Sequence, residues 1–185
     1  MVCLCIEPTP RSCGGAAEIT AEYDRRILAI VNDAVGISPV VSSAAYNAAS
    51  DSQGSNFIAI PLWRNLHTSD PLTTGIQAMN IGEASARATI SFFDSNGDVV
   101  KLDDPTDWEV DIPPMSAHTW YPTSLGGMPI GMYGSAAITT TGEPLLVIVN
   151  DASVANVRDS AIYSGLIEQD GSLGLSLPRL DVFEP

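Results

Sequence analysis

An internal repeat constrains this sequence more than any other feature. The segment Ile27–Ala34 (ILAIVNDA) matches Leu145–Ala152 (LLVIVNDA), which begins 118 residues later, and six of the eight positions are identical. Three shorter pairs of blocks also match, in the same order along the chain and at offsets of 117–119 residues. They are Gly15–Thr20 with Gly134–Thr139, Ser43–Asn47 with Ser160–Ser164, and Ala59–Leu62 with Ser176–Arg179. Because such self-similarity at a fixed period is typical of tandem arrays, the sequence predicts a repeated unit of about 118 residues.

The boundaries of the 118-residue unit do not coincide with the two ends of the 185-residue sequence. We expect a poorly ordered leader at 1–14, the closing strands of a preceding unit at 15–54, one complete unit at 55–171, and the first strand of a following unit at 172–185. The leader holds all three cysteines, Cys3, Cys5 and Cys13. An odd count confined to one end does not make a disulfide framework, and a metal site there would lack a fourth ligand.

Short alternating segments fill the complete unit. In Ala86–Phe93 the residues Ala86, Ala88, Ile90 and Phe92 point one way, which is the period of a β-strand. Asn96-Gly97 then predicts a tight turn, after which Val99–Leu102 returns. Further strands are predicted at Asn56–Trp63, Thr74–Asn80, Trp108–Ile112, Ala117–Trp120, Gly134–Thr140 and Leu145–Asn150, the last two forming a hairpin around Thr141–Pro144.

The predicted fold class is all-β, an antiparallel β-sandwich. Short strands about 8–15 residues apart, separated by turns rich in glycine and proline, are typical of this class. Residues 16–32 also carry acids and Arg26 at helical spacing, but the aligned copy reads as strand, turn and strand. We therefore expect strands there too.

The order of these segments resembles the immunoglobulin-like modules of about 110–120 residues that are repeated in large secreted or surface-anchored bacterial proteins. The resemblance covers residues 55–166 well and 15–54 as a partial copy. It rests on Thr74–Gly82, Phe92–Val100, Ile112–Ser116, Gly134–Thr139 with Pro144–Asn150, and Tyr163–Gly165. It implies a structural or adhesive role at the cell surface or outside the cell, although no convincing signal peptide begins this chain.

Charge and missing motifs exclude several classes of function. The formal net charge is -14, and the single lysine, Lys101, and the seven scattered arginines form no basic patch that would offset the repulsion of a nucleic acid. No apolar run reaches the ~18–20 residues of a transmembrane helix. The two histidines, His67 and His118, stand in no catalytic motif, with His67 expected in a surface loop and His118 on a strand face. We expect a protein that is not an enzyme and needs no cofactor, with calcium as one alternative.

Acidic residues gather around the predicted 94–98 turn. Calcium prefers several carboxylate and carbonyl oxygens, so five of these residues are candidate ligands: Asp94, Asp98, Asp103, Asp104 and Asp107. A hairpin alone also explains the Asn-Gly pair, and the downstream glutamate of an EF-hand is missing. The acids expected on the solvated rim of the sandwich are Asp94, Asp98, Asp103, Asp104, Glu109, Asp111 and Asp151.

Aromatic rings offer a second candidate site, because exposed rings stack on the faces of sugars. The candidates for a surface glycan are Trp63, Trp120 and Tyr121. Trp120 and Tyr121 are adjacent, so in a strand they face opposite sides and one is expected to be exposed. Trp108 alternates in phase with Val110 and Ile112 and is expected in the core.

A third alternative follows from the phase of the repeat. The chain holds closing strands at its start and an opening strand at its end, so unpaired edges are expected. Such edges invite pairing with another strand, and copies of the chain are then candidate partners that build a filament by strand addition.

Overall fold

The computed structural model describes residues 17–20, 29–37, 40–69, 71–153 and 160–167. Within these ranges the chain forms antiparallel strands and three 3₁₀ turns, with no α-helix. No helix in the described part has the length and hydropathy that crossing a bilayer requires. The expected leader at 1–14, its cysteines and the strand expected at 172–185 lie outside the described residues.

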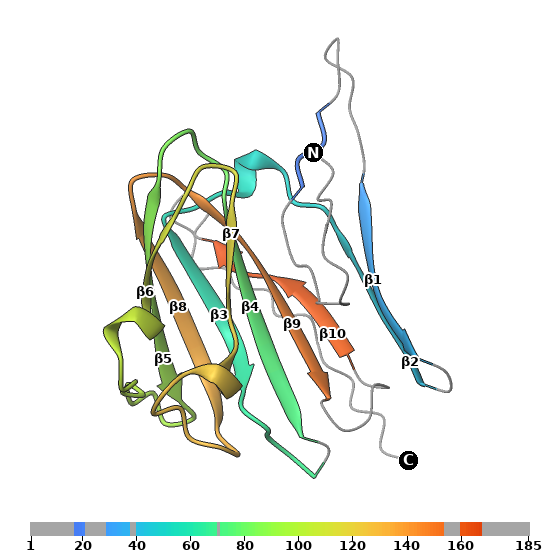
Figure 1. The fold of residues 1–185 in the computed structure, drawn as a ribbon, viewed down its shortest axis with the longest axis vertical. Helices are drawn as coiled ribbons and strands as arrows, with labels where there is room; N and C mark the ends of the chain where they lie inside the picture. Colours follow the sequence, from blue (N-terminus) through green and yellow to red (C-terminus); the bar gives the residue numbers. More distant parts are fainter. Residues whose placement is uncertain (1–16, 21–28, 38–39, 70, 154–159, 168–185) are drawn as a thin grey trace, which may run out of the picture.

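Two sheets stack to form a β-sandwich, as the strand pattern predicted (Figure 1). One sheet has the order β11-β3-β8-β5-β6 and the other the order β10-β9-β4-β7. The strands of the first sheet are β3 (Phe57–Arg64), β5 (Ala86–Asp94), β6 (Glu109–Ile112), β8 (Tyr133–Thr141) and β11 (Leu166–Ile167). Those of the second are β4 (Leu72–Asn80), β7 (Ala117–Trp120), β9 (Leu145–Ser153) and β10 (Ser160–Ser164).

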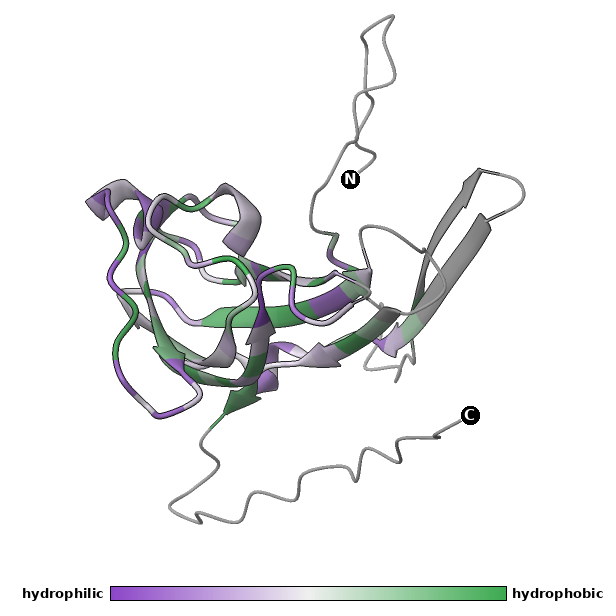
Figure 2. Ribbon diagram, turned by 90° about the horizontal axis from the view of Figure 1, so that it is seen from below, coloured by the Kyte–Doolittle hydropathy of each residue, from purple (hydrophilic) through white to green (hydrophobic). Residues whose placement is uncertain are grey.

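The core lies between the sheets and follows the period of the strands. Every second residue of β5 from Ala86 to Phe92 is buried, which confirms the predicted phase. The largest buried side chains are Trp63, Trp120 and Phe92, and aliphatic residues from both sheets pack around them. Hydrophobic residues run along the strands of both sheets in Figure 2. Removing these surfaces from water drives the two sheets together.

The predicted turn at Asn96-Gly97 is confirmed. Gly97 has a φ of +89°, a conformation that favours glycine, and its N–H donates to the carbonyl of Asp94. Beyond the turn, Val99 forms a single bridge with Phe93, and the N–H of Val100 donates to the carbonyl of Phe92. The returning segment 99–102 is therefore not a strand of its own.

The hairpin predicted between 134–140 and 145–150 is wrong. The strands exist as β8 and β9, but β8 pairs with β3 and β5, whereas β9 pairs with β4 and β10. The segment between them, where Gly142 has a φ of +97°, carries the chain from one sheet to the other. Each strand thereby turns an apolar face to the shared core from opposite sides, which a local hairpin would not allow.

A separate hairpin lies beside this sandwich. It consists of β1 (Ile30–Ile37) and β2 (Val40–Asn47), and β2 runs alongside edge strand β10 without joining its sheet (Figure 1). Strand structure was expected over residues 16–32. Of these, residues 17–20 are not in a strand, 21–28 lie outside the described residues, and β1 begins only at Ile30.

The hairpins β1–β2 and β9–β10 share one pairing register. In the first, Val31 pairs with Tyr46 and Ile30 with Asn47. In the second, Val149 pairs with Tyr163 and Ile148 with Ser164. These are the positions that the 117–118-residue offset aligns in the sequence, so the matching segments also match in strand pairing.

Candidate functional site

The β9–β10 hairpin is held to the rest of the sandwich by a polar cluster. The surface of β3 and β4 that contacts this hairpin, which includes Leu62, Arg64 and Thr74, is called the hairpin seat below. Its central contact joins the two sheets, because Nη1 of Arg64 on β3 lies 2.5 Å from Oδ2 of Asp151 on β9. The hydroxyl of Thr74 on β4 donates to Oδ1 of Asp151 at 2.9 Å and accepts from the backbone N–H of Arg64 at 2.9 Å.

Burial controls the chemistry of this cluster. The Asp151 side chain is only 8% exposed and that of Arg64 is 22% exposed. Burial raises the pKa of Asp151, and the charge of Arg64 and the hydroxyl of Thr74 oppose that shift. A carboxylate removed from water in this way depends on its partners, so the pair ties the position of β9 to that of β3.

Tyr163 makes a second attachment on β10. Its hydroxyl donates to the carbonyl of Leu62 at 2.5 Å, across 101 residues of sequence. Burial raises its pKa, and the charge of Asp151 raises it further. The phenol therefore stays protonated and keeps its role as a donor at any physiological pH.

The apolar part of the seat is tightly packed. Leu145, Val147 and Val149 of β9 are all buried in the core. Directly after β10, the N–H of Gly165 donates to the carbonyl of Val147. A Cβ at Gly165 would lie 2.3 Å from Cγ2 of Ile58, so the chain leaves the hairpin through a space that admits only glycine.

Sequence reasoning missed this seat. Asp151 was expected on the solvated rim, which is wrong, since the residue is 6% exposed. Asp98, Asp103, Asp104 and Asp111 are exposed as expected, whereas Asp94 and Glu109 are half-buried. The signal that identifies Asp151 is its phase, because it alternates with Leu145, Val147 and Val149 on the inward face of β9. Its partner Arg64 lies 87 residues away, and only the fold brings the two together.

The three aromatic candidates do not form one platform. Trp63 is fully buried, where its Nε1–H donates to the carbonyls of Phe93 and Ser135. Trp120 is 1% exposed, so the expectation that these two rings are available to a sugar is wrong. Tyr121 is 52% exposed and covers Gly75, which confirms that one of the adjacent pair faces out. The core fills with the largest apolar side chains, which explains the burial of both tryptophans.

Three of the five aspartates proposed as calcium ligands, Asp94, Asp104 and Asp107, use their carboxylates to accept backbone hydrogen bonds. Among the described residues, no three or more His, Cys, Asp or Glu side chains gather as metal ligands would. Oδ1 of Asp94 instead accepts from the N–H groups of Asn96 and Asp98, and these bonds lower its pKa. Asp104 caps the turn at Pro105–Asp107 through the N–H and hydroxyl of Thr106, and its pKa is lowered.

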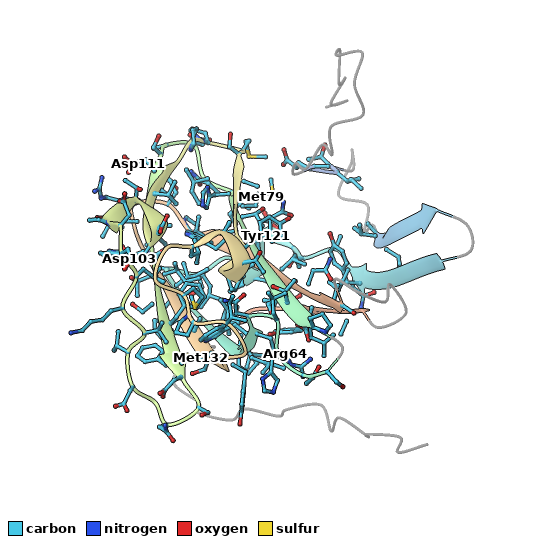
Figure 3. The ribbon with its side chains drawn as sticks, turned by 60° about the horizontal axis from the view of Figure 1, so that its bottom comes forward. Arg64, Met79, Asp103, Asp111, Tyr121 and Met132 are labelled. Atoms are coloured by element: carbon cyan, nitrogen blue, oxygen red, sulfur yellow. The ribbon has the colours of Figure 1, made fainter. Side chains whose placement is uncertain are left out.

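Asp103 and Asp107 lie against a neighbouring loop. Oδ2 of Asp107 accepts from the N–H of Gly126, and the N–H of Asp103 donates to the carbonyl of Gly126. Figure 3 shows Asp103 and Asp111 on one side of the molecule, well away from Arg64. The acidic cluster thus orders turns, and the structure does not support the calcium site predicted there.

Both histidines are placed by packing. Nδ1 of His67 lies 2.9 Å from the carbonyl oxygen of Gly131, and its ring lies 4.5 Å from that of Tyr133. His118 on β7 packs edge-on against Trp120 at 4.6 Å, and burial lowers its pKa. Both positions agree with the expected loop and strand face.

A groove lies between residues 89–92 of β5 and the returning segment 99–102. Its volume is about 370 Å³. It is lined mainly by aliphatic and aromatic residues, with Lys101 and Trp108 among them. Trp108 is partly buried and packs against the core cluster, so its ring is only partly in the core that the sequence predicted.

Comparisons with known proteins agree with the fold class. No family model matches the chain, and no curated protein does either. A solved structure, described as the crystal structure of Thermotoga maritima 1070, is similar to this chain with a TM-score of 0.50. The likeness covers 63% of this chain and 97% of that one at 20% sequence identity. At that identity the comparison shows the fold alone, an antiparallel all-β sandwich.

Proposed function

We propose that this chain is a structural or adhesive module of an extracellular or cell-surface bacterial protein, with no enzymatic activity. Its unit would be an immunoglobulin-like sandwich of about 118 residues that recurs in the full protein. The observation that carries the proposal is the second hairpin. β1–β2 matches β9–β10 in sequence and in pairing register, which is what a repeated unit predicts.

The chemistry of the described residues supports a role in architecture. Four polar side chains form hydrogen bonds that join one strand to another: Arg64, Thr74, Asp151 and Tyr163. The acids of the turns are likewise engaged with backbone N–H groups. A net charge of -14 supports solubility of repeated copies through mutual repulsion.

Accessibility on intact cells tests this proposal. Antibodies raised against residues 55–167 should bind unpermeabilised cells of the source organism, and brief protease treatment of those cells should remove the signal. A cytoplasmic protein detected only after lysis serves as the control for cell integrity. Binding that appears only after lysis would contradict the surface location.

A further inference from the structure

The turn that follows β5 holds an asparagine and a glycine that are both open to water. Asn96 lies in the 94–98 turn, and its side chain is exposed. Gly97 follows it with a φ of +89°, and nothing lies within 4 Å of the position that a Cβ would occupy. This is the only Asn-Gly pair in the sequence. The turn therefore presents an accessible side-chain amide next to a residue that has no side chain to shield it.

An asparagine in this setting reacts with its own main chain. The backbone nitrogen of Gly97 forms a bond to Cγ of Asn96, the bond from Cγ to the amide nitrogen breaks, and ammonia leaves with the proton of the Gly97 N–H. The product is a five-membered succinimide. Water then opens the ring at Cγ, which gives aspartate, or at the backbone carbonyl, which gives isoaspartate with the main chain routed through Cβ and Cγ. Glycine allows this ring closure because it has no Cβ in the way.

We propose that Asn96 is a site of spontaneous deamidation by water, and that its isoaspartyl product opens the turn that ends β5. Three hydrogen bonds cross the link between residues 96 and 97. The N–H of Gly97 donates to the carbonyl of Asp94 at 3.0 Å, and the N–H of Asp94 donates to the carbonyl of Asp98 at 2.9 Å. The N–H of Asp98 donates to Oδ1 of Asp94 at 2.9 Å. An isoaspartyl link adds one main-chain atom inside all three rings, so the distances and angles of these bonds are lost.

The returning segment depends on this turn for its position. Val99 forms a single bridge with Phe93, and the N–H of Val100 donates to the carbonyl of Phe92. These contacts follow directly after the turn, and the same segment forms one wall of the groove beside β5. The pairing of β5 with β8 lies on the other side of the strand. We therefore expect the isoaspartyl chain to lose order at this edge of the sheet while the sandwich stays folded.

The ordinary aspartyl product has a different effect. It keeps the length of the main chain, so the three bonds of the turn remain, and it only adds a negative charge near Asp94 and Asp98. Repulsion between exposed charges is weak in water and is screened by salt. The two products of one reaction therefore separate the effect of charge from the effect of the altered main chain.

Storage of the folded full-length chain in mildly alkaline buffer tests the reaction. Peptide mapping by mass spectrometry should find the exchange of amide for acid at Asn96. Asn56 is the matched internal control, because it is also exposed but precedes the bulky Phe57, and it should stay unconverted. The bond that the Gly97 N–H makes in the turn should slow the folded chain about fivefold relative to the chain in urea. Equal conversion at Asn56 would overturn the proposal, as would an intact Asn96 when the chain in urea has converted completely.

A second measurement tests the effect on the turn. An isoaspartyl methyltransferase labels only the isoaspartyl product, and the labelled fraction should unfold at a lower urea concentration than the parent. It should also lose the acid dependence that comes from Asp94, whose pKa is lowered chiefly by the N–H of Asp98. Freshly purified Asn96→Asp carries the added charge without the added main-chain atom, and it should unfold as the parent does. A labelled fraction that unfolds at the same midpoint as Asn96→Asp would overturn the opening of the turn.

Asn96→Gln is the control for the storage itself. Its side chain is longer by one methylene, so a five-membered ring cannot form, and the exposed position tolerates the change. After the same storage this variant should show neither label nor a shift in its unfolding midpoint. Label or a midpoint shift equal to that of the stored parent would place the reaction elsewhere and overturn the assignment to Asn96. None of these measurements depends on cellular location, so they fail separately from the surface-labelling experiment.

Discussion

The guanidinium of Arg64 and the carboxylate of Asp151 form a 2.5 Å ion pair that joins the two sheets of the sandwich. Breaking it from one side leaves a buried carboxylate without its cation. We expect Arg64→Met to lower the free energy of unfolding by about 2–3 kcal/mol, less than for a fully buried pair because Arg64 is 22% exposed. Urea denaturation measures the change.

A double-mutant cycle separates the pair from its surroundings. Arg64→Met with Asp151→Asn should cost less than the sum of the two single changes, by about 1 kcal/mol or more. Arg87→Met, which removes an exposed pair with Glu109, is the matched control and should barely alter stability. If the two changes in unfolding free energy are strictly additive, the interaction between Arg64 and Asp151 does not contribute to stability.

The hydroxyl of Tyr163 contributes separately from the ion pair. Tyr163→Phe keeps the ring but leaves the carbonyl of Leu62 without this donor, so we expect a loss of about 1 kcal/mol in the free energy of unfolding. Tyr121→Phe alters an exposed ring and should change stability less. Equal effects of the two substitutions in thermal unfolding would contradict the role assigned to Tyr163.

The space around residue 134 admits no side chain larger than that of glycine. A Cβ there would lie 1.9 Å from the carbonyl oxygen of Phe93, a backbone atom that cannot move without breaking the β5–β8 pairing. We expect Gly134→Ala to destabilise the fold by about 3 kcal/mol, as overpacking does. Gly97→Ala, where φ is +89° but nothing lies within 4 Å, isolates backbone strain and should cost only about 1 kcal/mol.

The turn at Asp94 makes stability depend on acid. The pKa of Asp94 is lowered in the folded state, chiefly by the N–H of Asp98, so the unfolded chain binds the proton more readily. Its contribution is present at neutral pH and is lost as the pH falls through the ordinary value of 3.8 and below. Asp94→Asn keeps an oxygen for the same N–H groups, so it should flatten this acid limb while keeping most of the stability at pH 7.

Asp151 has the opposite sign. Because burial raises its pKa in the folded state, the folded chain holds this proton more tightly, and its contribution to stability falls as the pH rises through the raised pKa. Asp151→Asn should therefore remove a decrease of stability with rising pH. Unfolding curves for Asp94→Asn and Asp151→Asn collected between pH 3 and 7 should deviate from the parent in opposite directions. Deviations of the same sign would contradict one of the two assignments.

Local patterns determined the strands of this protein and their inward faces. Period-2 alternation placed Ala86, Ala88, Ile90 and Phe92 in the core, and the bounds of β7 followed from Ala117–Trp120 and the proline after it. The repeat aligned the sequence of β1 with that of β9 and the sequence of β2 with that of β10, although it did not predict that these strands pair as hairpins. These features depend on neighbours in sequence, so the sequence specifies them alone.

Only the tertiary structure decided which strands pair and which polar groups are buried. β8 and β9 are consecutive and separated by a turn, yet they belong to different sheets, because each has its partners elsewhere in the chain. Arg64, Thr74 and Asp151 are unremarkable in sequence and meet because three strands converge. Trp63 and Trp120 are buried because their large apolar rings fill the space between the two sheets. Such relations depend on contacts between distant segments, and no local pattern encodes them.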